Sequence, residues 1–375
     1  MFENLETPRL ILDRGRLIKN MQLFMARAKE LGVKLRPHLK TPKSVEVGKL
    51  AKDGDMTGIT VSTLKEAEYF ANNGFSDIMH AASITPNKFA RVKRIFETSG
   101  QQIILATDSL WVAKEAVSYA AANDCDLAFV IEVDCGEHRS GLPSDSGELV
   151  AIAQVLNAGE RTHFKGVFTH GGHSYLASDR SEVAKISEIE RSAVTGAAKR
   201  LADVDIDCDI VSVGSSPTVL WAEHLEGVTE VRAGVYLFWD LMQYALNVCE
   251  LDDIAMSVLA TVIGHNREAK TIIVDAGALA MSKDIGANAN LPDAKYGYVC
   301  DATTLERIGA LSINALYQEH GIVQVEDDAL FDRLPIGSLV RILPNHSCLT
   351  ASPFDSYTVI EDDKVIGEWS RMSGW

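Results

Sequence analysis

Two lysines lie three positions apart in the stretch Leu35–Lys43, directly after the short apolar run Val33–Leu35. A lysine that follows the first strand of an α/β barrel points into the mouth, where such barrels carry their active sites. If it is partly desolvated beside another cation, it loses its proton easily enough to form a Schiff base with an aldehyde. On chemical grounds alone Lys40 and Lys43 are equal candidates, and a surface loop with two solvated lysines is the simpler interpretation.

A second stretch that could do chemistry is Pro344–Cys348, in which His346 and Cys348 are two positions apart. On an extended segment, positions i and i+2 point to the same side. Imidazole and thiolate are both good zinc ligands, although a closed structural site needs four ligands. The pair therefore fits a catalytic metal site with open positions for water and substrate. Zinc is the first expectation, with manganese, cobalt or magnesium as alternatives.

Small residues follow two later apolar runs, and they are Gly214, Ser215, Ser216 and Gly234. Their backbone N–H groups and hydroxyls can form an anion-binding nest, and Gly234 lets the backbone of Val235 and Tyr236 approach a ligand closely. The loops after the seventh and eighth strands are where barrels most often bind phosphate. Two ordinary turns would have the same composition, but their paired location favours a phosphate site.

The elements that must position these residues alternate between strands and helices. Strand cores are expected at residues 34–37, 58–61, 77–80, 103–106, 127–133, 165–169, 209–213 and 229–233. Helical patterns are expected at residues 64–72, 86–98, 110–123, 147–158 and 180–201. This is the count of an α/β fold with a TIM-like (β/α)₈ barrel, predicted over residues 13–245. An open doubly wound sheet would require a glycine-rich turn after the first strand, and the sequence has none there.

The pattern changes after about residue 245, where strand-like runs follow one another with few helices. These runs are residues 255–263, 270–275, 321–325, 338–343, 357–360 and 364–369. Residues 361–364 predict a hairpin turn, and the polar stretch 282–301 predicts a loop. A short strand at residues 9–12 precedes Asp13, which is expected to cap a helix. We therefore predict a second, mostly β domain.

Composition narrows the class of protein. The net charge of −16 disfavours nucleic acid and anionic membranes as partners. No apolar run is long enough to span a bilayer, and the first residues lack the order of a signal peptide. Six cysteines without close pairs favour reduced thiols. We expect a cytoplasmic protein that acts on a small molecule.

The string Arg36-Pro37-His38-x-Lys40-x-x-Lys43 resembles the start of the pyridoxal phosphate (PLP) enzymes with an alanine-racemase-type barrel. It is most similar to the group that contains D-serine dehydratase, D-threo-3-hydroxyaspartate dehydratase and D-threonine aldolase. Further similar strings lie at residues 132–142, 169–175, 230–236, 275–284, 318–321 and 344–348. The chain departs from the family spelling at Pro42, where the family has a histidine before the second lysine.

The resemblance implies roles for several of these residues. Lys40 rather than Lys43 would carry PLP, and Arg139 would face the ring nitrogen, although an arginine bridging Asp134 is the structural alternative. The phosphate would be held by backbone groups near Gly234, Val235 and Tyr236. His170 and Tyr175 would pack on or hydrogen-bond to the ring, although a lone histidine at a strand end is often structural. The family is also a fold type III group in which the N-terminal strand joins the β domain, so that residues 1–12 and 246–375 would form the domain with the metal ligands.

The resemblance further implies a lyase for β-hydroxy D-amino acids that depends on PLP and on a divalent metal, and that acts as a homodimer. Lys40 would take the Cα proton, and the metal at His346 and Cys348 would help the β-hydroxyl to leave as water, giving a 2-oxo acid and ammonia. A cysteine in this pair resembles the dehydratases, whereas an aspartate resembles the D-threonine aldolases. Retro-aldol cleavage to glycine and an aldehyde is therefore the alternative, ahead of a racemase or a non-catalytic PLP-binding protein. Roles for His173, Glu319 and His320 stay open.

Overall fold

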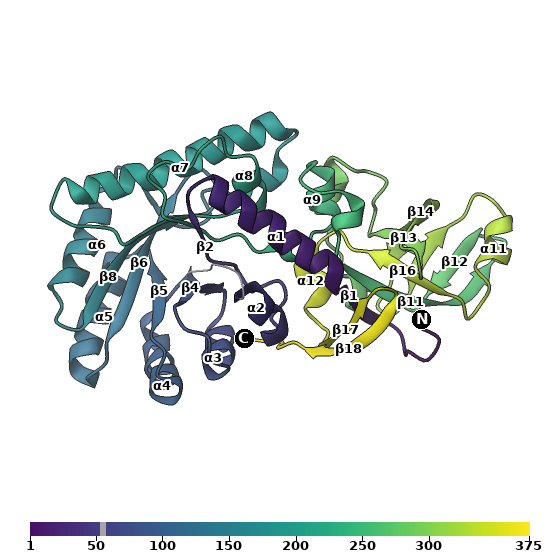
Figure 1. Ribbon diagram of the computed structural model, residues 1–375, viewed down its shortest axis with the longest axis horizontal. Coiled ribbons are helices and arrows are strands. Elements are labelled where there is room, and N and C mark those ends of the chain that lie inside the picture. Colours follow the sequence, from purple (N-terminus) through teal and green to yellow (C-terminus); the bar gives the residue numbers. More distant parts are fainter. Residues whose placement is uncertain (53–57) are drawn as a thin grey trace. The chain divides into compact units, whose positions relative to one another are not determined.

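The computed structural model describes residues 1–52 and 58–375. They form two compact units, which are described separately here (Figure 1). One unit contains Leu23–Gly234 with Gly374–Trp375, and the other contains Met1–Gln22 with Val235–Ser373. The sequence-based domain limits, at residues 12/13 and 245/246, stay a prediction.

The unit Leu23–Gly234 is built on eight parallel strands, of which the second to the eighth are each hydrogen-bonded to the next along the chain. The strands are β2 (Lys34–Leu35), β3 (Ile59–Val61), β4 (Ile78–Ser83), β5 (Ile103–Thr107), β6 (Leu127–Asp134), β8 (Thr162–Thr169), β9 (Ile210–Val213) and β10 (Glu230–Val231). β2 also pairs with β10, and a parallel bridge between His38 and Thr60 joins the two ends of the sheet. The predicted (β/α)₈ barrel is therefore confirmed. The short β7 (Leu142–Pro143) adds to β6 outside this ring.

Helices connect most of these strands and lie around them (Figure 1). They are α2 (Val45–Lys52), α3 (Leu64–Asn72), η1 (Pro86–Lys88), α4 (Phe89–Ser99), α5 (Leu110–Asn123), α6 (Gly147–Ala158), η2 (Gly172–Leu176), α7 (Arg180–Ala202) and α8 (Ser216–Leu220), preceded by α1 (Arg14–Glu30). Side-chain oxygens cap the starts of several of them, for example Ser109 at α5 and Asp179 at α7. Such caps are visible in the sequence, which is why the predicted bounds of α3, α5 and α6 are confirmed.

The sheet buries an apolar cluster from five adjacent strands and an ionic group beside it. The apolar members are Met79, Ile104, Ala106, Ala128, Val130, Phe168 and Ile210. Arg36, which is 3% exposed, donates to both carboxylate oxygens of Glu230 at 2.9 Å and to Asp77 at 2.9 and 3.0 Å. A buried guanidinium is stable only with such partners, so Arg36 of the lysine motif is a structural residue.

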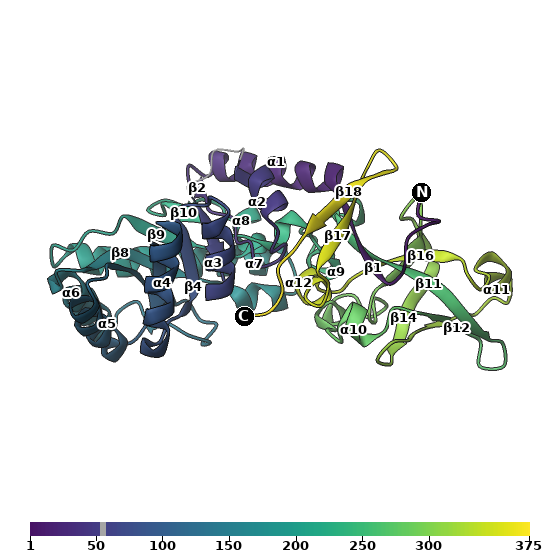
Figure 2. The same ribbon diagram turned by 90° about the horizontal axis from the view of Figure 1, so that it is seen from below.

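The second unit is a nine-stranded sheet, part of which closes on itself (Figure 2). The closed part contains β11 (Met256–Asn266), β12 (Thr271–Val274), β13 (Tyr298–Asp301), β14 (Arg307–Leu316), β15 (Gly321–Gln324) and β16 (Leu339–Leu343). β1 (Arg9–Asp13), β17 (Ser356–Glu361) and β18 (Lys364–Ser370) extend it beyond β11. The short helices are η3 (Val235–Leu237), α9 (Leu241–Ala245), η4 (Leu251–Asp253), α10 (Ala278–Met281), η5 (Gly286–Ala289), α11 (Ala329–Arg333) and α12 (Ser347–Ala351).

The N-terminal strand joins this second unit, as the family resemblance implies. β1 pairs antiparallel with β11 and parallel with β17. Asp13 then accepts the amide of Arg16 at 3.0 Å and caps α1, as predicted. The hairpin between β17 and β18 is also confirmed, since Asp362 and Asp363 both have positive φ, at 48° and 57°.

One region of the β unit differs from the prediction. The expected loop at residues 282–301 contains η5 and the strand β13, and β14 after it was not expected at all. β14 pairs with register shifts on both sides and has Gly309 at φ 56°. These bulges break the alternation of apolar and polar residues by which a strand is predicted.

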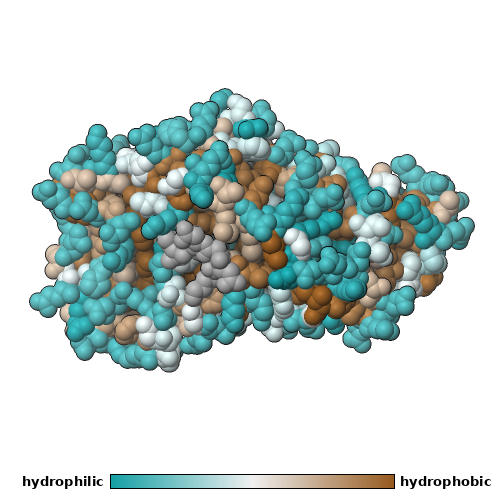
Figure 3. All heavy atoms as spheres, in the orientation of Figure 1, coloured by the Kyte–Doolittle hydropathy of each residue, from teal (hydrophilic) through white to brown (hydrophobic). Residues whose placement is uncertain are grey.

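Hydrophilic residues cover most of the face drawn in Figure 3.

Candidate active site

The two lysines of the motif lie in different surroundings. The chain beyond β2 stays extended, because the amides of Arg36 and His38 donate to Val231 and Ala233 at 2.9 and 2.8 Å. Lys40 follows in the turn at the carboxyl end of this strand, and its side chain is exposed. This is the end at which barrels carry their catalytic residues.

Lys43 instead reaches a buried carboxylate. Its ammonium lies 3.0 Å from Glu66, which is fully buried and also accepts the amide and hydroxyl of Ser62 at 2.9 and 2.7 Å. Lys43 supplies the counter-charge of the buried Glu66 carboxylate, which gives this lysine a structural task. The contrast favours Lys40 as the lysine that can act as a nucleophile or base.

Two histidines lie near Lys40 and stay neutral. Burial, with Lys40 as the next cause, holds the pKa of both His38 and His170 well below the usual value. His170 Nδ1 lies within hydrogen-bond distance of the carbonyl oxygen of Gly214 and donates to it. The ring of Tyr175 lies 6.3 Å from that of His170 at a tilt of 50°. A neutral, oriented imidazole of this kind can lie against an aromatic ring without competing for protons.

The two arginines near the strand ends differ sharply. Arg139, the arginine predicted to face a cofactor ring, has 56% of its side chain exposed and approaches Glu137 at 3.4 Å. Arg232, directly after β10, is 5% exposed and donates to Thr169 O at 2.7 Å and to Ser212 Oγ at 2.8 Å. Among the described residues, its buried Nε–H has no acceptor. Such a donor points to a missing acceptor atom.

The residues predicted to hold phosphate lie at the ends of β9 and β10. Ser215 caps α8 by accepting the amide of Thr218 at 3.2 Å, and its hydroxyl lies 3.1 Å from that of Ser174. A Cβ on Gly234 would lie 2.6 Å from the carbonyl oxygen of His38, so only glycine permits this close approach. Gly214, Ser215, Ser216 and Gly234 are thus brought to one end of the barrel, while Val235 and Tyr236 begin the other unit.

Sequence reasoning missed Glu190, in the middle of α7. Its side chain is 1% exposed, and it accepts the amides of Gly171 and Gly214 at 2.8 and 2.9 Å. A glutamate inside a charged helical pattern normally predicts a solvated face. The available signal is its position: Ile186, Glu190, Val194 and Ala197 follow the spacing of the buried stripe.

In the β unit, His346 and Cys348 do meet, but not on an extended segment. His346 precedes α12 and Cys348 lies within it. The two side chains hydrogen-bond to each other. His346 Nδ1 also lies 2.8 Å from Asp284 Oδ2. This carboxylate–histidine contact leaves Nε2 and the Cys348 sulfur as the donors for a metal.

Backbone contacts fix this loop. Asp240 is 1% exposed and accepts the amide of Ser347 at 3.0 Å, and the amide of Leu241 donates to Pro344 O at 3.0 Å. Burial raises the pKa of Asp240, whereas the His346 hydrogen bond holds that of Asp284 below its usual value. Across the described residues, no cluster of three or more His, Cys, Asp or Glu side chains could hold a metal ion.

Two other strings singled out in the sequence pack against each other within the β unit. The amide of Ala278 donates to Tyr317 O at 2.7 Å, and a Cβ on Gly277 would lie 2.3 Å from Gln318 O. The side-chain amide of Gln318 donates to the carboxylate of Glu319 at 3.1 Å. This close backbone approach gives both strings a structural role, which is to pack residues 277–278 against residues 317–318. No described contact assigns chemistry to His173, Glu319 or His320.

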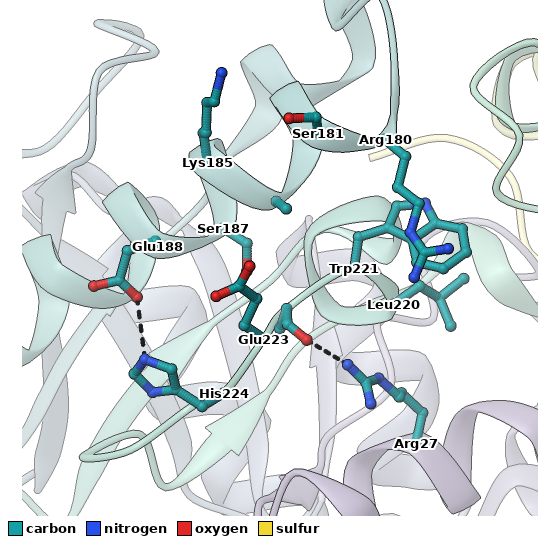
Figure 4. A pocket seen from close by; sticks show the side chains of 12 residues that line it. Arg27, Arg180, Ser181, Lys185, Ser187, Glu188, Leu220, Trp221, Glu223 and His224 are labelled. Atoms are coloured by element: carbon teal, nitrogen blue, oxygen red, sulfur yellow. Dashed lines mark hydrogen bonds and ion pairs between the residues drawn. The ribbon is translucent and has the colours of Figure 1, made fainter.

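A cavity of about 820 Å³ lies elsewhere, between the end of α1, the first half of α7 and residues 220–224 (Figure 4). The guanidinium of Arg180 lies 3.7 Å from the ring centroid of Trp221 there, and Lys185 points away from the pair. None of the predicted site residues lines it.

Among the described residues, no helix is long and apolar enough to cross a membrane.

The fold and these groups correspond to a known class of protein. Residues 12–241 match the family described as alanine racemase, N-terminal domain, and residues 255–360 match the putative serine dehydratase domain. The chain belongs to the alanine racemase N-terminal domain family, with a dehydratase-type domain after the barrel. This membership confirms the resemblance stated from the motifs.

Within that class, the chain is similar to named enzymes over nearly its whole length. It is 39% identical to D-threo-3-hydroxyaspartate dehydratase from Delftia sp. (strain HT23), covering 99% of this chain and 98% of that protein. It is 35% identical to D-serine dehydratase from Dictyostelium discoideum, with the same coverage. The solved Delftia dehydratase superposes with a TM-score of 0.96, covering 100% of this chain and 99% of that one. D-threonine aldolase from Arthrobacter sp. is 26% identical over 97% of this chain and 91% of that protein.

Proposed function

We propose that this protein is a PLP- and divalent-metal-dependent lyase that removes water from a β-hydroxy D-amino acid, giving a 2-oxo acid and ammonia. The observation that carries the proposal is an exposed Lys40 at the carboxyl end of the first barrel strand, in a chain 39% identical to a D-threo-3-hydroxyaspartate dehydratase. Membership of the alanine racemase-type family supports PLP as the cofactor.

The barrel residues fit PLP. Lys40 supplies the amine that joins the cofactor, and the loops with Ser215 and Gly234 supply the cradle for its phosphate. The buried Nε–H of Arg232, which has no acceptor among the described residues, suits the ring nitrogen better than the exposed Arg139 does. We therefore assign the ring-nitrogen role to Arg232 and give Arg139, at the mouth, the role of binding the substrate carboxylate. His170 and Tyr175 are assigned to the ring.

Each of these groups has a distinct task. When bound, PLP withdraws electrons from the Cα of the substrate and so acidifies its proton. Lys40 accepts that proton as a general base. Burial lowers the pKa of Arg232, but a guanidinium still does not release its proton in a protein, so Arg232 can donate to a ring nitrogen without protonating it. Neutral His170 stays oriented by Gly214 and takes no part in proton transfer.

The residues of the β unit fit a divalent metal through His346 Nε2 and the Cys348 thiolate. A metal ion held there would act as a Lewis acid and make the β-hydroxyl a better leaving group. Asp284 orients His346 and keeps its Nδ1 proton in place. A D-threo-3-hydroxyaspartate dehydratase variant in which a cysteine is replaced by alanine has been solved in a metal-free form, which supports a thiolate ligand in this family.

Retro-aldol cleavage to glycine and an aldehyde is the alternative function. It would use the same lysine and the same metal ligands. Cys348, rather than an aspartate, resembles the dehydratases, and the Delftia and Dictyostelium dehydratases, at 39% and 35% identity, are more similar to this chain than the Arthrobacter aldolase, at 26%. Both observations favour elimination.

One assay separates the two functions. Purified protein loaded with PLP and zinc is incubated with D-threo-3-hydroxyaspartate, D-serine and D-threonine, and the products are quantified. We expect oxaloacetate or pyruvate in equal amount to ammonia. Glycine with an aldehyde would establish the aldolase instead, and a change of optical rotation without either product would establish a racemase. The Lys40→Ala variant is the control for background.

A further inference from the structure

A buried carboxylate connects the loops after β8 and β9. Oε1 of Glu190 accepts the amides of both Gly171 and Gly214, at 2.8 and 2.9 Å. Oε2 accepts the hydroxyl of Thr218 at 2.7 Å. Gly171 follows β8, whereas Gly214 and Thr218 both follow β9. One side chain therefore fixes the end of one strand against the end of the next.

The two loops carry the groups assigned to the cofactor. Gly171 follows His170, and the Nδ1 of His170 donates to the carbonyl oxygen of Gly214. The amide of the same Gly214 donates to Glu190. The Thr218 hydroxyl lies 2.8 Å from that of Ser215. The Glu190 carboxylate is therefore linked to His170 through Gly214, and to Ser215 in the proposed phosphate loop through Thr218.

The surroundings of Glu190 are shaped for this carboxylate. A Cβ on Gly171 would lie 3.2 Å from Glu190 Cδ, so a side chain there would push the two apart. Burial raises the pKa of Glu190, and the hydrogen bonds from Thr218, Gly214 and Gly171 offset only part of this rise. An apolar residue would avoid the cost of burying a charge but would leave two amides unsatisfied.

We propose that Glu190 is a positioning residue for the cofactor: it sets the distance between the His170 loop and the Ser215 loop. It touches neither the reacting atoms nor the cofactor. The inference rests on the proposed function, because only a cofactor that spans both loops would sense their separation. Sequence analysis assigned no role to this residue.

The test compares Glu190→Gln with Glu190→Asp in the full chain. Glutamine keeps an oxygen at the position of Oε1 and can donate to Thr218, so both loops stay joined. Aspartate keeps the charge, but it is one methylene too short to reach both amides. Cofactor-free protein is titrated with PLP, the visible absorption of the loaded protein is recorded, and melting of the cofactor-free forms is followed. Glu188→Gln, two positions away on the exposed side of α7, is the matched control.

We expect Glu190→Asp to weaken PLP binding by roughly 10- to 100-fold, the loss typical of hydrogen bonds to a charged acceptor. Its visible band should also shift, while Glu190→Gln and Glu188→Gln keep wild-type affinity within about threefold. Wild-type affinity and band in Glu190→Asp would overturn the proposal. Equal losses in both Glu190 variants would also overturn it, since the loop contacts that glutamine keeps would then not be what PLP binding depends on. If Glu190→Asp does not fold, Gly171→Ala tests the same contact, and unchanged PLP binding there would overturn it. Failure of the wild type itself to bind PLP would instead refute the proposed function.

Discussion

The barrel and the β unit assemble their candidate chemistry in different ways. In the barrel, Lys40, His170, Ser215 and Arg232 come from separate strand ends and meet only because eight parallel strands end on one side. In the β unit, both proposed metal donors, His346 and Cys348, come from one short loop whose backbone is held by buried Asp240. A distributed site depends on the whole sheet, whereas a local site depends on a few contacts. The following predictions test this difference.

The largest effect is expected at the lysine of the barrel. Lys40→Ala should abolish the visible cofactor band and lower kcat by roughly 10²- to 10⁴-fold, the range that a general base contributes. Lys43→Met should keep the band but leave Glu66 buried without its counter-charge, at a cost of about 3 kcal/mol in unfolding free energy. Absorption spectra and urea unfolding measure the two effects. A band that survives in Lys40→Ala and disappears in Lys43→Met would reverse the assignment.

The local site should fail without unfolding the protein. Cys348→Ala should lose bound zinc and lower activity by more than about 100-fold, while Asp284→Asn should weaken metal affinity by about 10- to 100-fold because His346 loses its orientation. Metal analysis and zinc titration measure these changes, with Cys208→Ser as the control. Full activity after thorough chelation would remove the metal from the reaction.

Substitutions at Arg232 and Arg139 should separate binding of the PLP ring from binding of the substrate. Arg232→Met should shift the cofactor band and weaken PLP binding by roughly 10-fold or more, since a charge-assisted hydrogen bond is lost. Arg139→Ala should leave the band in place and raise KM for the D-amino acid. PLP titration and steady-state kinetics distinguish them. The opposite pattern would restore Arg139 to the ring role first predicted for it.

The smallest effect on activity is expected at a residue that governs the stability of the barrel against acid. Burial, and next the charge of Lys88, lower the pKa of His80 to about 4, and the residue is 3% exposed. The unfolded chain therefore binds more protons than the folded one between about pH 6.5 and 4, so stability is full above this window and falls as the pH is lowered through it. His80→Gln should remove about 3 kcal/mol of this pH dependence, measured by urea unfolding at pH 7 and pH 4. Parallel curves for the variant and the wild type would contradict the prediction.

The sequence predicted best what depends on local pattern. The helix α5, with Ser109 before it, and the hairpin at Asp362 both follow from a few neighbouring residues. The pair His346 and Cys348 was also recognisable, although its two side chains meet at the start of α12 and not on a strand. Local signals of this kind need no knowledge of the tertiary structure.

Residues whose role depends on distant partners were harder to predict. Glu190 lies in a charged helical sequence, and although its spacing matches the buried stripe, its role follows only from hydrogen bonds with two distant loops. The ring role of Arg139 stays a prediction, and Arg232 became a candidate only through its burial and its Nε–H, which has no acceptor among the described residues. β14 was missed because its bulges interrupt the alternating pattern. In each case a contact with a residue far away in the chain decides the outcome.

The ion pair between Lys43 and Glu66 has a consequence for reagents other than the cofactor. The Lys43 side chain is 17% exposed and its amine contacts the buried Glu66 carboxylate, so passing carbonyl compounds reach it less readily than they reach the exposed Lys40. Of the two amino groups in this turn, one is therefore shielded from such adducts. Selective labelling of this segment by a dilute aldehyde, followed by reduction and peptide mapping, would display that shielding as a single modified position.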